Sequence, residues 1–327
     1  SIRSNFFYTR TVPCELWFFD RAKPAERKEK VLMLDARNVY RKVTRKIYDF
    51  SPEQMRNLAA IVWLYRGEQN RFLSQVKDYI SRICAESKAV PVALATFERT
   101  LTDLRGRFDC FADAVAKQAE PDAEKKQPLA DAAIELREAA TLYEIDREKL
   151  LASLQIFGEK YAKALPDEND AQHAARKAFD PIAEAARGLI RQVDLLYKLT
   201  ARMGDLAIDH PLLLGEGRGE GESGYEARIV RRLLKQLDEE RKAAVEQLKR
   251  AVYFHRQVAW LQDRFPKSEL QAVPGLVKLV DFREIRAANW SLTPGRYVGV
   301  APPDEDENFD FEQTIRDIHT KLADLNK

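Results

Sequence analysis

The sequence predicts a mostly helical protein with a small β part, on three observations. Across residues 71–260, apolar side chains recur at spacings of three and four, the period of an amphipathic helix. Ahead of this stretch lie two short apolar runs, at residues 12–20 and 31–36, that are typical of strands. Behind it, residues 276–280 form a further short apolar run. We therefore expect a helical module with strands on either side of it in the sequence.

The chain is expected to divide into three segments. Residues 1–70 hold the first strands, residues 71–264 form a helical hairpin or bundle, and residues 265–327 hold a turn and a final helix. A further strand over residues 276–280 should lead into a short helix at residues 282–286.

The first two apolar runs predict strands without a sheet of their own. Residues 12–20 are aromatic and mostly apolar, as buried strands are. A charged loop of about ten residues separates them from residues 31–36, which suits an antiparallel hairpin at the end of a larger sheet. Their partners should lie N-terminal to Ser1. Both chain ends are expected to be cut edges, because the start has neither Met nor a signal peptide and the last helix has no stop signal.

The helical part begins with a clear start signal. Ser51 suits the N-cap, Pro52 the first helical position, and Gly67 the end of this helix. Later breaks are expected at residues 121–128, 166–170 and 210–224. The helix after the last break carries an apolar stripe that suits either a short antiparallel coiled coil or a core-facing bundle helix. That stripe consists of Ile229, Leu233, Leu237, Ala244, Leu248 and Val252.

Composition excludes several classes of protein. The 327 residues are 45% hydrophobic and 32% charged, which is ordinary for a water-soluble helical protein. Three scattered cysteines and four histidines without ligand spacing argue against disulfide scaffolds and metal sites, and they fit a reducing cytoplasm. No apolar run reaches the roughly 18–20 residues of a membrane span. The glycine-rich residues 215–221 follow no buried strand and contain glutamates, which indicates a linker rather than a phosphate-binding loop.

Charge is segregated along the chain although the net charge is only +2. Residues 1–48 hold twelve Lys and Arg against five Asp and Glu, whereas residues 301–327 hold three against eight. Residues 228–256 hold nine basic against four acidic side chains. The two basic regions suit contact with nucleic acid or with an acidic partner. Solvated surface is the alternative reading of both.

Three segments resemble, in the same order, the modification subunits of type I restriction–modification systems. Residues 5–20 (NFFYTRTVPCELWFFD) are similar to that family's Asn-Leu-Phe-Tyr, small residues, Ile-Pro and strand. Residues 31–37 (VLMLDAR), followed by a helix that ends in WLYRG, form the second segment. Residues 290–299 (WSLTPGRYVG) resemble the family's Asn-Leu-Thr/Asn-Pro-Gly-Arg-Tyr-Val. The resemblance covers residues 1–67 and 265–327, and leaves the helical middle unassigned.

This resemblance implies a DNA methyltransferase that modifies the N6 atom of adenine. In the family, a Rossmann-like sheet binds S-adenosylmethionine, and the first strands here would be the edge of that sheet. The family's cofactor loop and its Asn-Pro-Pro-aromatic motif should precede residue 1, since the only Pro-Pro here, Pro302-Pro303, lacks both the Asn and the aromatic residue. We expect this fragment alone to be inactive, with no catalytic, cofactor-binding or metal-binding residues of its own.

The same resemblance implies a cytoplasmic complex on DNA with no membrane association. The partners would be the specificity subunit, a second modification subunit and the restriction subunit. A helical scaffold protein without catalytic activity is the alternative function, supported by the long helical middle. The reading frame upstream of Ser1 separates the two.

An aromatic pair is the candidate pocket for the target base. A base that leaves the duplex needs an aromatic face in place of its lost stacking. Phe7 or Tyr8 matches the family aromatic that packs on that base, and Arg10 could meet a DNA phosphate. Core packing is the competing reading of the aromatics. The family often has glycine where Thr9 and Thr11 stand, so close approach of the backbone to a ligand is not supported at those positions.

The C-terminal tail is the candidate subunit contact. After an acidic loop, an amphipathic helix is expected, and in the family this tail leads to the specificity subunit. A core face within the same chain is the alternative. Its apolar stripe consists of Phe311, Ile315, Ile318, Leu322 and Leu325.

Overall fold

The computed structural model describes residues 1–6, 11–44, 47–116, 123–208 and 222–301. These residues are mostly helical with a few short strands, which confirms the predicted fold class. The chain forms two compact units, one made of Ser1–Leu58 with Leu270–Lys327 and the other of Ala59–Glu269. We call them the terminal unit and the helical unit. The three-segment division along the chain stays a prediction.

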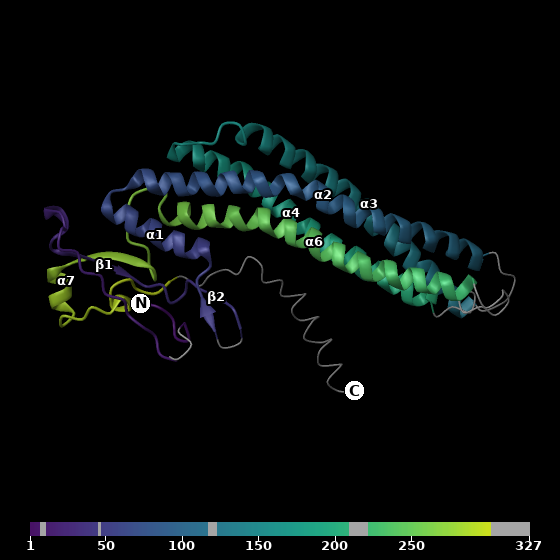
Figure 1. The fold of residues 1–327 in the computed structure, drawn as a ribbon, viewed down its shortest axis with the longest axis horizontal. Coiled ribbons are helices and arrows are strands. Elements are labelled where there is room, and N and C mark those ends of the chain that lie inside the picture. Colours follow the sequence, from purple (N-terminus) through teal and green to yellow (C-terminus); the bar gives the residue numbers. More distant parts are fainter. Residues whose placement is uncertain (7–10, 45–46, 117–122, 209–221, 302–327) are drawn as a thin grey trace. The chain divides into compact units, whose positions relative to one another are not determined.

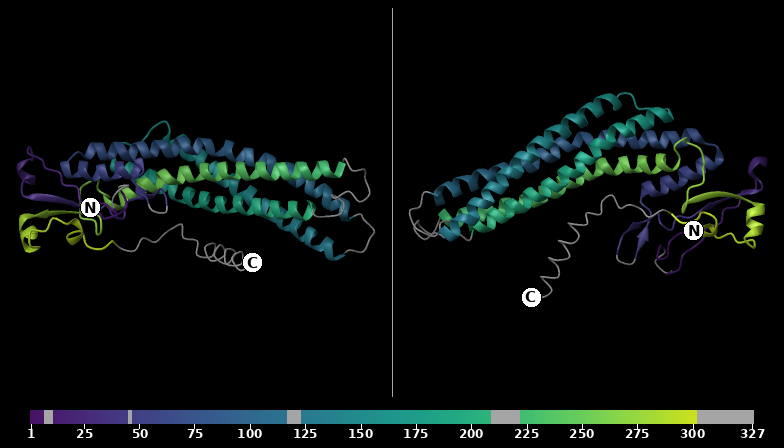
Figure 2. Two further views of the ribbon diagram at one scale, coloured as in Figure 1. Left: turned by 60° about the horizontal axis from the view of Figure 1, so that its bottom comes forward. Right: turned by 180° about the vertical axis from the view of Figure 1, so that it is seen from behind.

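The helical unit is a bundle of four long helices that lie side by side (Figures 1 and 2). Their bounds are α2 (Gln69–Ala116), α3 (Ala123–Tyr161), α4 (Asn169–Ile208) and α6 (Glu222–Arg264). Helix α6 packs against both α2 and α4. Of the two readings of the last long helix, the structure therefore selects the bundle helix. Its predicted stripe is buried from Leu233 to Val252, while Ile229 is partly exposed.

Burial of aromatic side chains holds these helices together. Helix α2 has 48 residues and so extends over about 70 Å. A helix of this length is stabilised mainly by the packing of its apolar face and less by helix propensity. Phe157 on α3 and Phe179 on α4 meet edge to face, with ring centroids 4.9 Å apart. Tyr143 is 2% exposed, and its hydroxyl donates a hydrogen bond to Glu98 of α2 at 2.8 Å. Buried aromatic side chains thus connect neighbouring helices of the bundle, through ring contacts and through a hydrogen bond.

Helix α1 (Pro52–Arg66) starts and stops where the sequence predicts. The Ser51 Oγ accepts a hydrogen bond from the Gln54 amide at 3.1 Å, and the Gln54 side chain accepts one from the Ser51 amide at 2.9 Å. This reciprocal pair satisfies amides that the first helical turn leaves without partners. Gly67 follows the helix with φ +77°, a conformation that glycine adopts without strain. Of the break predicted at residues 166–170, residues 166–168 lie in the connection between α3 and α4, and Asn169 and Asp170 already belong to α4. The break predicted at residues 121–128 is wrong from Ala123 onward, because α3 begins there and includes Pro128 in its first turns.

The terminal unit contains two short antiparallel strand pairs. Strand β1 (Lys30–Leu34) pairs with β4 (Val277–Asp281), placing Val31 opposite Val280. Strand β2 (Arg41–Lys42) pairs with β3 (Tyr48–Asp49). Asp281 caps the short helix α7 (Phe282–Ala287) by accepting a hydrogen bond from the Glu284 amide. The predicted strands at residues 31–36 and 276–280 and the short helix after the second are therefore present.

Two of the resembling segments share one core. Met33 and Val280 of the paired strands pack with Ile285 of α7 and with Val298. The segment that carries Val298 also contains a short 3-10 helix, Pro294–Arg296. Residues 31–37 and 290–299, far apart in the sequence, are thus brought together in the terminal unit.

The strand predicted at residues 12–20 is wrong, as is its hairpin with residues 31–36. Within this run the structure has only an isolated bridge from Cys14 to Ile2, and β1 pairs with β4 instead. The expected burial is also wrong, because this run is largely exposed. The exposed fractions are 56% for Leu16, 57% for Trp17, 90% for Phe18 and 86% for Phe19. Apolar sequence predicts the tendency to form a strand, but a strand needs a partner, which these residues lack in the part of the chain that the structure describes.

Among the glycines whose surroundings the structure describes, Gly275 is expected to be the least tolerant of alanine. It has φ +72°, and a Cβ there would lie 2.4 Å from the backbone nitrogen of Ala301. Gly299 has the same φ, but a Cβ added to it would meet nothing within 4 Å. Gly299→Ala should therefore cost only the left-handed strain, about 1–2 kcal/mol, and Gly275→Ala distinctly more. Urea unfolding of both variants checks this, and equal losses would show that the backbone near Ala301 yields to the new methyl group.

Candidate functional site

A shallow depression lies in the terminal unit beside the first resembling segment. It is lined by Arg3, Ser4, Pro13, Arg37 and Asn38. Two of these side chains are guanidinium groups, and two others carry a hydroxyl and an amide. The lining is thus rich in groups that donate hydrogen bonds.

Arg3 is held in place by aromatic rings. Its guanidinium carbon lies 4.3 Å from the ring centroid of Tyr40 and 4.8 Å from that of Tyr48. The two tyrosine rings meet edge to face at 5.1 Å. The Arg3 Nε is buried and has no hydrogen-bond partner among the described residues. Cation–π contact with the two rings therefore fixes the position of the Arg3 guanidinium.

Arg37 is held by a carboxylate instead. Its Nε and Nη2 donate to Asp35 at 2.9 and 2.6 Å, in the two-point geometry typical of arginine and carboxylate. Burial opposes ionisation of Asp35, but the hydrogen bonds from Arg37 outweigh it and hold the pKa of Asp35 below its ordinary value. A Cβ at position 295 would lie 2.6 Å from the Arg37 Nη2, so glycine there admits the guanidinium. Gly295 belongs to the third resembling segment, which thereby contacts the second.

The predicted pocket residues cannot be compared with this geometry, because Phe7, Tyr8 and Arg10 lie outside the described residues. Their neighbour Phe6 packs on Phe50 with ring centroids 4.4 Å apart. Asn5 has φ 62°, so the backbone turns sharply just before this segment. The predicted subunit contact at Phe311, Ile315, Ile318 and Leu322 also lies outside the described part of the chain.

The chemistry of the depression is that of an anion contact. Guanidinium, amide and hydroxyl groups suit a phosphate oxygen, and the described residues of the lining include no carboxylate, thiol or imidazole for acid–base or nucleophilic work. Sequence reasoning missed Arg3 and Arg37. For Arg37 the signal was its place two residues after Asp35 at a strand end, whereas Arg3 gave no signal because its aromatic partners lie far along the chain.

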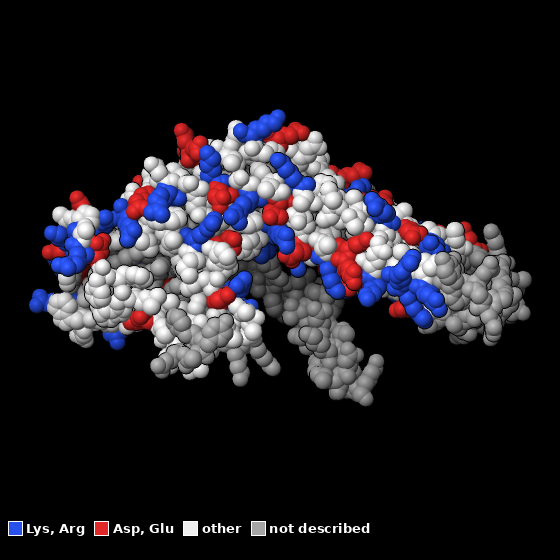
Figure 3. Space-filling view, in the orientation of Figure 1, with Lys and Arg blue, Asp and Glu red and all other residues white. Residues whose placement is uncertain are grey.

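Charged side chains of both signs are interspersed over the visible surface (Figure 3). In the basic region of α6, Arg241 pairs with Asp194 at 2.5 Å and with Asp238 at 2.7 Å. Lys242 also pairs with Asp238, and Arg250 with Glu246. These basic side chains form ion pairs with carboxylates of the bundle itself. This favours the alternative that the basic residues of α6 form a solvated surface and do not bind a partner.

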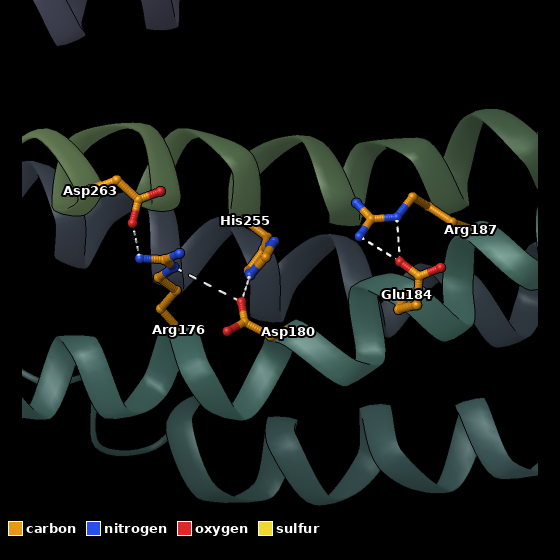
Figure 4. A network of polar contacts seen from close by, with 6 residues as sticks. All are labelled: Arg176, Asp180, Glu184, Arg187, His255 and Asp263. Atoms are coloured by element: carbon orange, nitrogen blue, oxygen red, sulfur yellow. Dashed lines mark hydrogen bonds and ion pairs between the residues drawn. The ribbon is translucent and has the colours of Figure 1, made fainter. Parts of the chain in front are cut away.

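A polar network ties α4 to α6 in the helical unit (Figure 4). The His255 Nε2 lies 2.7 Å from Asp180, and Arg176 donates to Asp263 at 2.5 Å. The His255 side chain is 9% exposed and its ring centroid lies 5.3 Å from that of Phe179. Burial lowers the pKa of His255, although Asp180 acts in the opposite direction. The network cross-links the two helices, because His255 and Asp263 of α6 pair with Asp180 and Arg176 of α4.

We expect His255 to make the helical unit sensitive to acid. Because the folded-state pKa is depressed, the unfolded chain binds more protons once the pH falls below the unfolded value near 6.5. Stability should therefore be full above that pH and decrease as the pH falls through it. Thermal unfolding at pH 7.5 and 5.5 should show a larger loss for the native chain than for His255→Gln. His173→Gln is the control, since that histidine contacts the Pro266 carbonyl at the surface. If His173→Gln reduced the loss of thermal stability between pH 7.5 and 5.5 as much as His255→Gln does, His255 would not be the origin of the acid sensitivity.

No group of three or more His, Cys, Asp or Glu side chains that could hold a metal ion occurs in the described ranges. Likewise, none of the described helices combines the length and the apolar character that crossing a membrane requires.

Comparison with known proteins finds a similarity for the first part of the chain. Residues 1–86 match the family model described as N-6 DNA methylase, a span that includes the first two resembling segments. Neither the curated proteins nor the solved structures contain a match to the chain. The N-terminal part is therefore similar to DNA methylases that act on N6, and that family generally uses S-adenosylmethionine. The residues described around the depression do not fit this cofactor, because none of them is a carboxylate that could hold the ribose hydroxyls.

Proposed function

We propose that this chain is the C-terminal part of the DNA-modifying subunit of a type I restriction–modification system. The intact subunit would transfer a methyl group from S-adenosylmethionine to the N6 atom of adenine in DNA. The observation that carries the proposal is the family match over residues 1–86. The three motifs in family order support the finer assignment, as does the packing of the second and third motifs in one core.

In this proposal the fragment supplies parts of the site rather than the reaction itself. Phe7 and Tyr8 would stack on the extruded adenine. Arg10, together with Arg3 and Arg37, would meet phosphates of the DNA backbone, where a positive charge strengthens binding without reading sequence. The methyl donor would be held by residues outside this chain, because the sequence contains neither the family's cofactor loop nor its Asn-Pro-Pro-aromatic motif. Residues 1–327 alone are therefore expected to transfer no methyl group.

A helical scaffold remains the second candidate. The observation that favours it is the four-helix bundle, most of which lies beyond the family match. The complete reading frame distinguishes the two functions. An upstream cofactor loop and Asn-Pro-Pro-aromatic motif would support the methyltransferase, whereas a frame without either would support the scaffold.

We also propose that the tail binds the specificity subunit, in a cytoplasmic complex with a second modification subunit and the restriction subunit. Deleting residues 309–327 from the intact subunit should then abolish co-purification with the specificity subunit, because the apolar stripe would be the contact. Replacing the charged Asp317 and Lys321 by alanine, between the stripe positions, is the control and should leave the complex intact. Continued complex formation after the deletion would mean that the stripe does not carry the contact.

A further inference from the structure

The backbone of Ser1 is hydrogen-bonded like a residue inside a sheet. Its nitrogen donates to the Leu34 carbonyl at 2.8 Å, and its carbonyl accepts from the Ala36 amide at 2.9 Å. These two bonds, on either side of Asp35, are the pattern of a parallel pair. Ser1 therefore runs beside the end of β1 in the same direction as β1.

The other side of this short segment is paired as well. The Ile2 amide donates to the Cys14 carbonyl at 2.8 Å, and the Cys14 amide donates to the Ile2 carbonyl at 3.2 Å. This is an antiparallel bridge. Ser1 and Ile2 thus lie between the end of β1 and residue 14, as one strand lies between two others. Neighbouring strands are about 4.8 Å apart.

The outer edge of β1 has backbone groups that face away from β4. In an antiparallel pair, hydrogen-bonded and non-bonded positions alternate. The Asp35 amide donates to the Leu276 carbonyl, so in the same register Val31 and Met33 bond to β4, whereas Lys30, Leu32 and Leu34 point outward. The Leu34 carbonyl already receives Ser1, and the Lys30 carbonyl receives the Lys23 ammonium. Among the described residues, no strand pairs with the outward groups of Leu32.

A run of exposed apolar side chains follows Cys14 in the sequence. Residues 16–19 expose four large apolar side chains, and Phe18 is 90% exposed. The rings of Trp17 and Phe19 have centroids 6.3 Å apart, as side chains two positions apart do on one side of an extended chain. A contiguous apolar run of this size on a small unit indicates a surface that another element covers.

We propose that the outer edge of β1 and residues 14–19 form a slot for one apolar β-strand that leads directly into Ser1. This strand runs parallel to β1 and antiparallel to residues 14–19. The pairing of Ser1 with Asp35 sets its register: the second residue before Ser1 donates to the Leu32 carbonyl and accepts from the Leu34 amide. The pairing of Ile2 with Cys14 places the first and third residues before Ser1 opposite Leu16 and Phe18.

The occupant is a continuation of this polypeptide rather than a second copy. Ser1 already sits in the slot with its direction fixed, and a strand from another molecule would have to end against its amino group. Burial also lowers the pKa of the Ser1 amino group, whereas a peptide N–H at the same place would donate the same hydrogen bond without a charge. This inference goes beyond the proposed function, since it concerns strand pairing and not methyl transfer.

Hydrogen–deuterium exchange tests the slot without any activity assay. The chain is extended at Ser1 by the eight residues that its own reading frame encodes upstream, and exchange of the Leu32 and Leu34 amides is compared with that of residues 1–327. We expect exchange of both amides to slow at least about tenfold in the extended chain, because each gains a strand partner. The control carries proline two residues before Ser1, which removes the N–H that would reach the Leu32 carbonyl and so weakens the pairing of the added strand. Exchange of the Leu32 and Leu34 amides, which would donate to carbonyls of that strand, should then return toward that of the shorter chain.

Three results would overturn the inference. One is equal exchange of Leu32 and Leu34 in the extended chain and in residues 1–327. Another is equal protection with and without the proline. The third is protection of the unextended chain that rises with protein concentration together with dimers in sedimentation, since the occupant would then be a second copy. None of these bears on methyl transfer, so failure of the slot and failure of the proposed function are distinguishable.

Discussion

Replacing Phe179 by alanine is expected to destabilise the helical unit by about 3–5 kcal/mol. Phe179 is 1% exposed, and its ring contacts Phe157 edge to face at 4.9 Å while lying 5.3 Å from the His255 ring. Alanine would leave a cavity between α3, α4 and α6, and long rigid helices can close such a cavity only in part. Urea unfolding followed by helical circular dichroism measures the loss.

The matched control is an apolar side chain on the same bundle that faces outward. Ile156 on α3 is 67% exposed, although it precedes the buried Phe157 directly. Ile156→Ala should change the free energy of unfolding by at most about 0.5 kcal/mol. Similar losses for Phe179→Ala and Ile156→Ala would show that the core of the bundle is not where the structure places it.

Phe7→Ala and Tyr8→Ala in the intact subunit are expected to slow methylation of DNA. If either ring replaces the lost stacking of the extruded adenine, its removal should cost about 1–3 kcal/mol. That cost corresponds to a rate about 5- to 150-fold lower. Transfer of a labelled methyl group from S-adenosylmethionine to DNA measures the rate, and circular dichroism verifies that the fold is retained.

Met55→Ala is the control for this pair. Met55 lies on α1 and is 54% exposed, so its removal should leave both fold and rate unchanged. Unchanged rates in Phe7→Ala and Tyr8→Ala alike would remove both residues from the base pocket and return them to a packing role.

Local features were predictable from the sequence because their causes are local. The Ser51 cap needs only Gln54 three positions on, and the apolar stripe of α6 needs only helical spacing. Strand β1 is likewise marked by its own apolar run. These elements therefore stand where the residues alone indicate.

Long-range pairing was not predictable in the same way. Residues 12–20 have a strand-like composition, yet β1 takes its partner from Val277–Asp281 at the other end of the chain. Which edge pairs with which depends on tertiary packing around Met33 and Val298, and a single sequence does not reveal it. The positions of Arg3 and Arg37 depend on the same packing, which is why the depression became visible only in the structure.

The measurement that tests the proposed function most directly is methyl transfer by the intact subunit assembled with its specificity subunit. Labelled S-adenosylmethionine and duplex DNA are the substrates, and the product nucleosides are identified. We predict N6-methyladenine from the intact subunit and none from residues 1–327 alone. A folded, assembled subunit that yields no N6-methyladenine would contradict the proposal, as would methyl transfer by residues 1–327 alone.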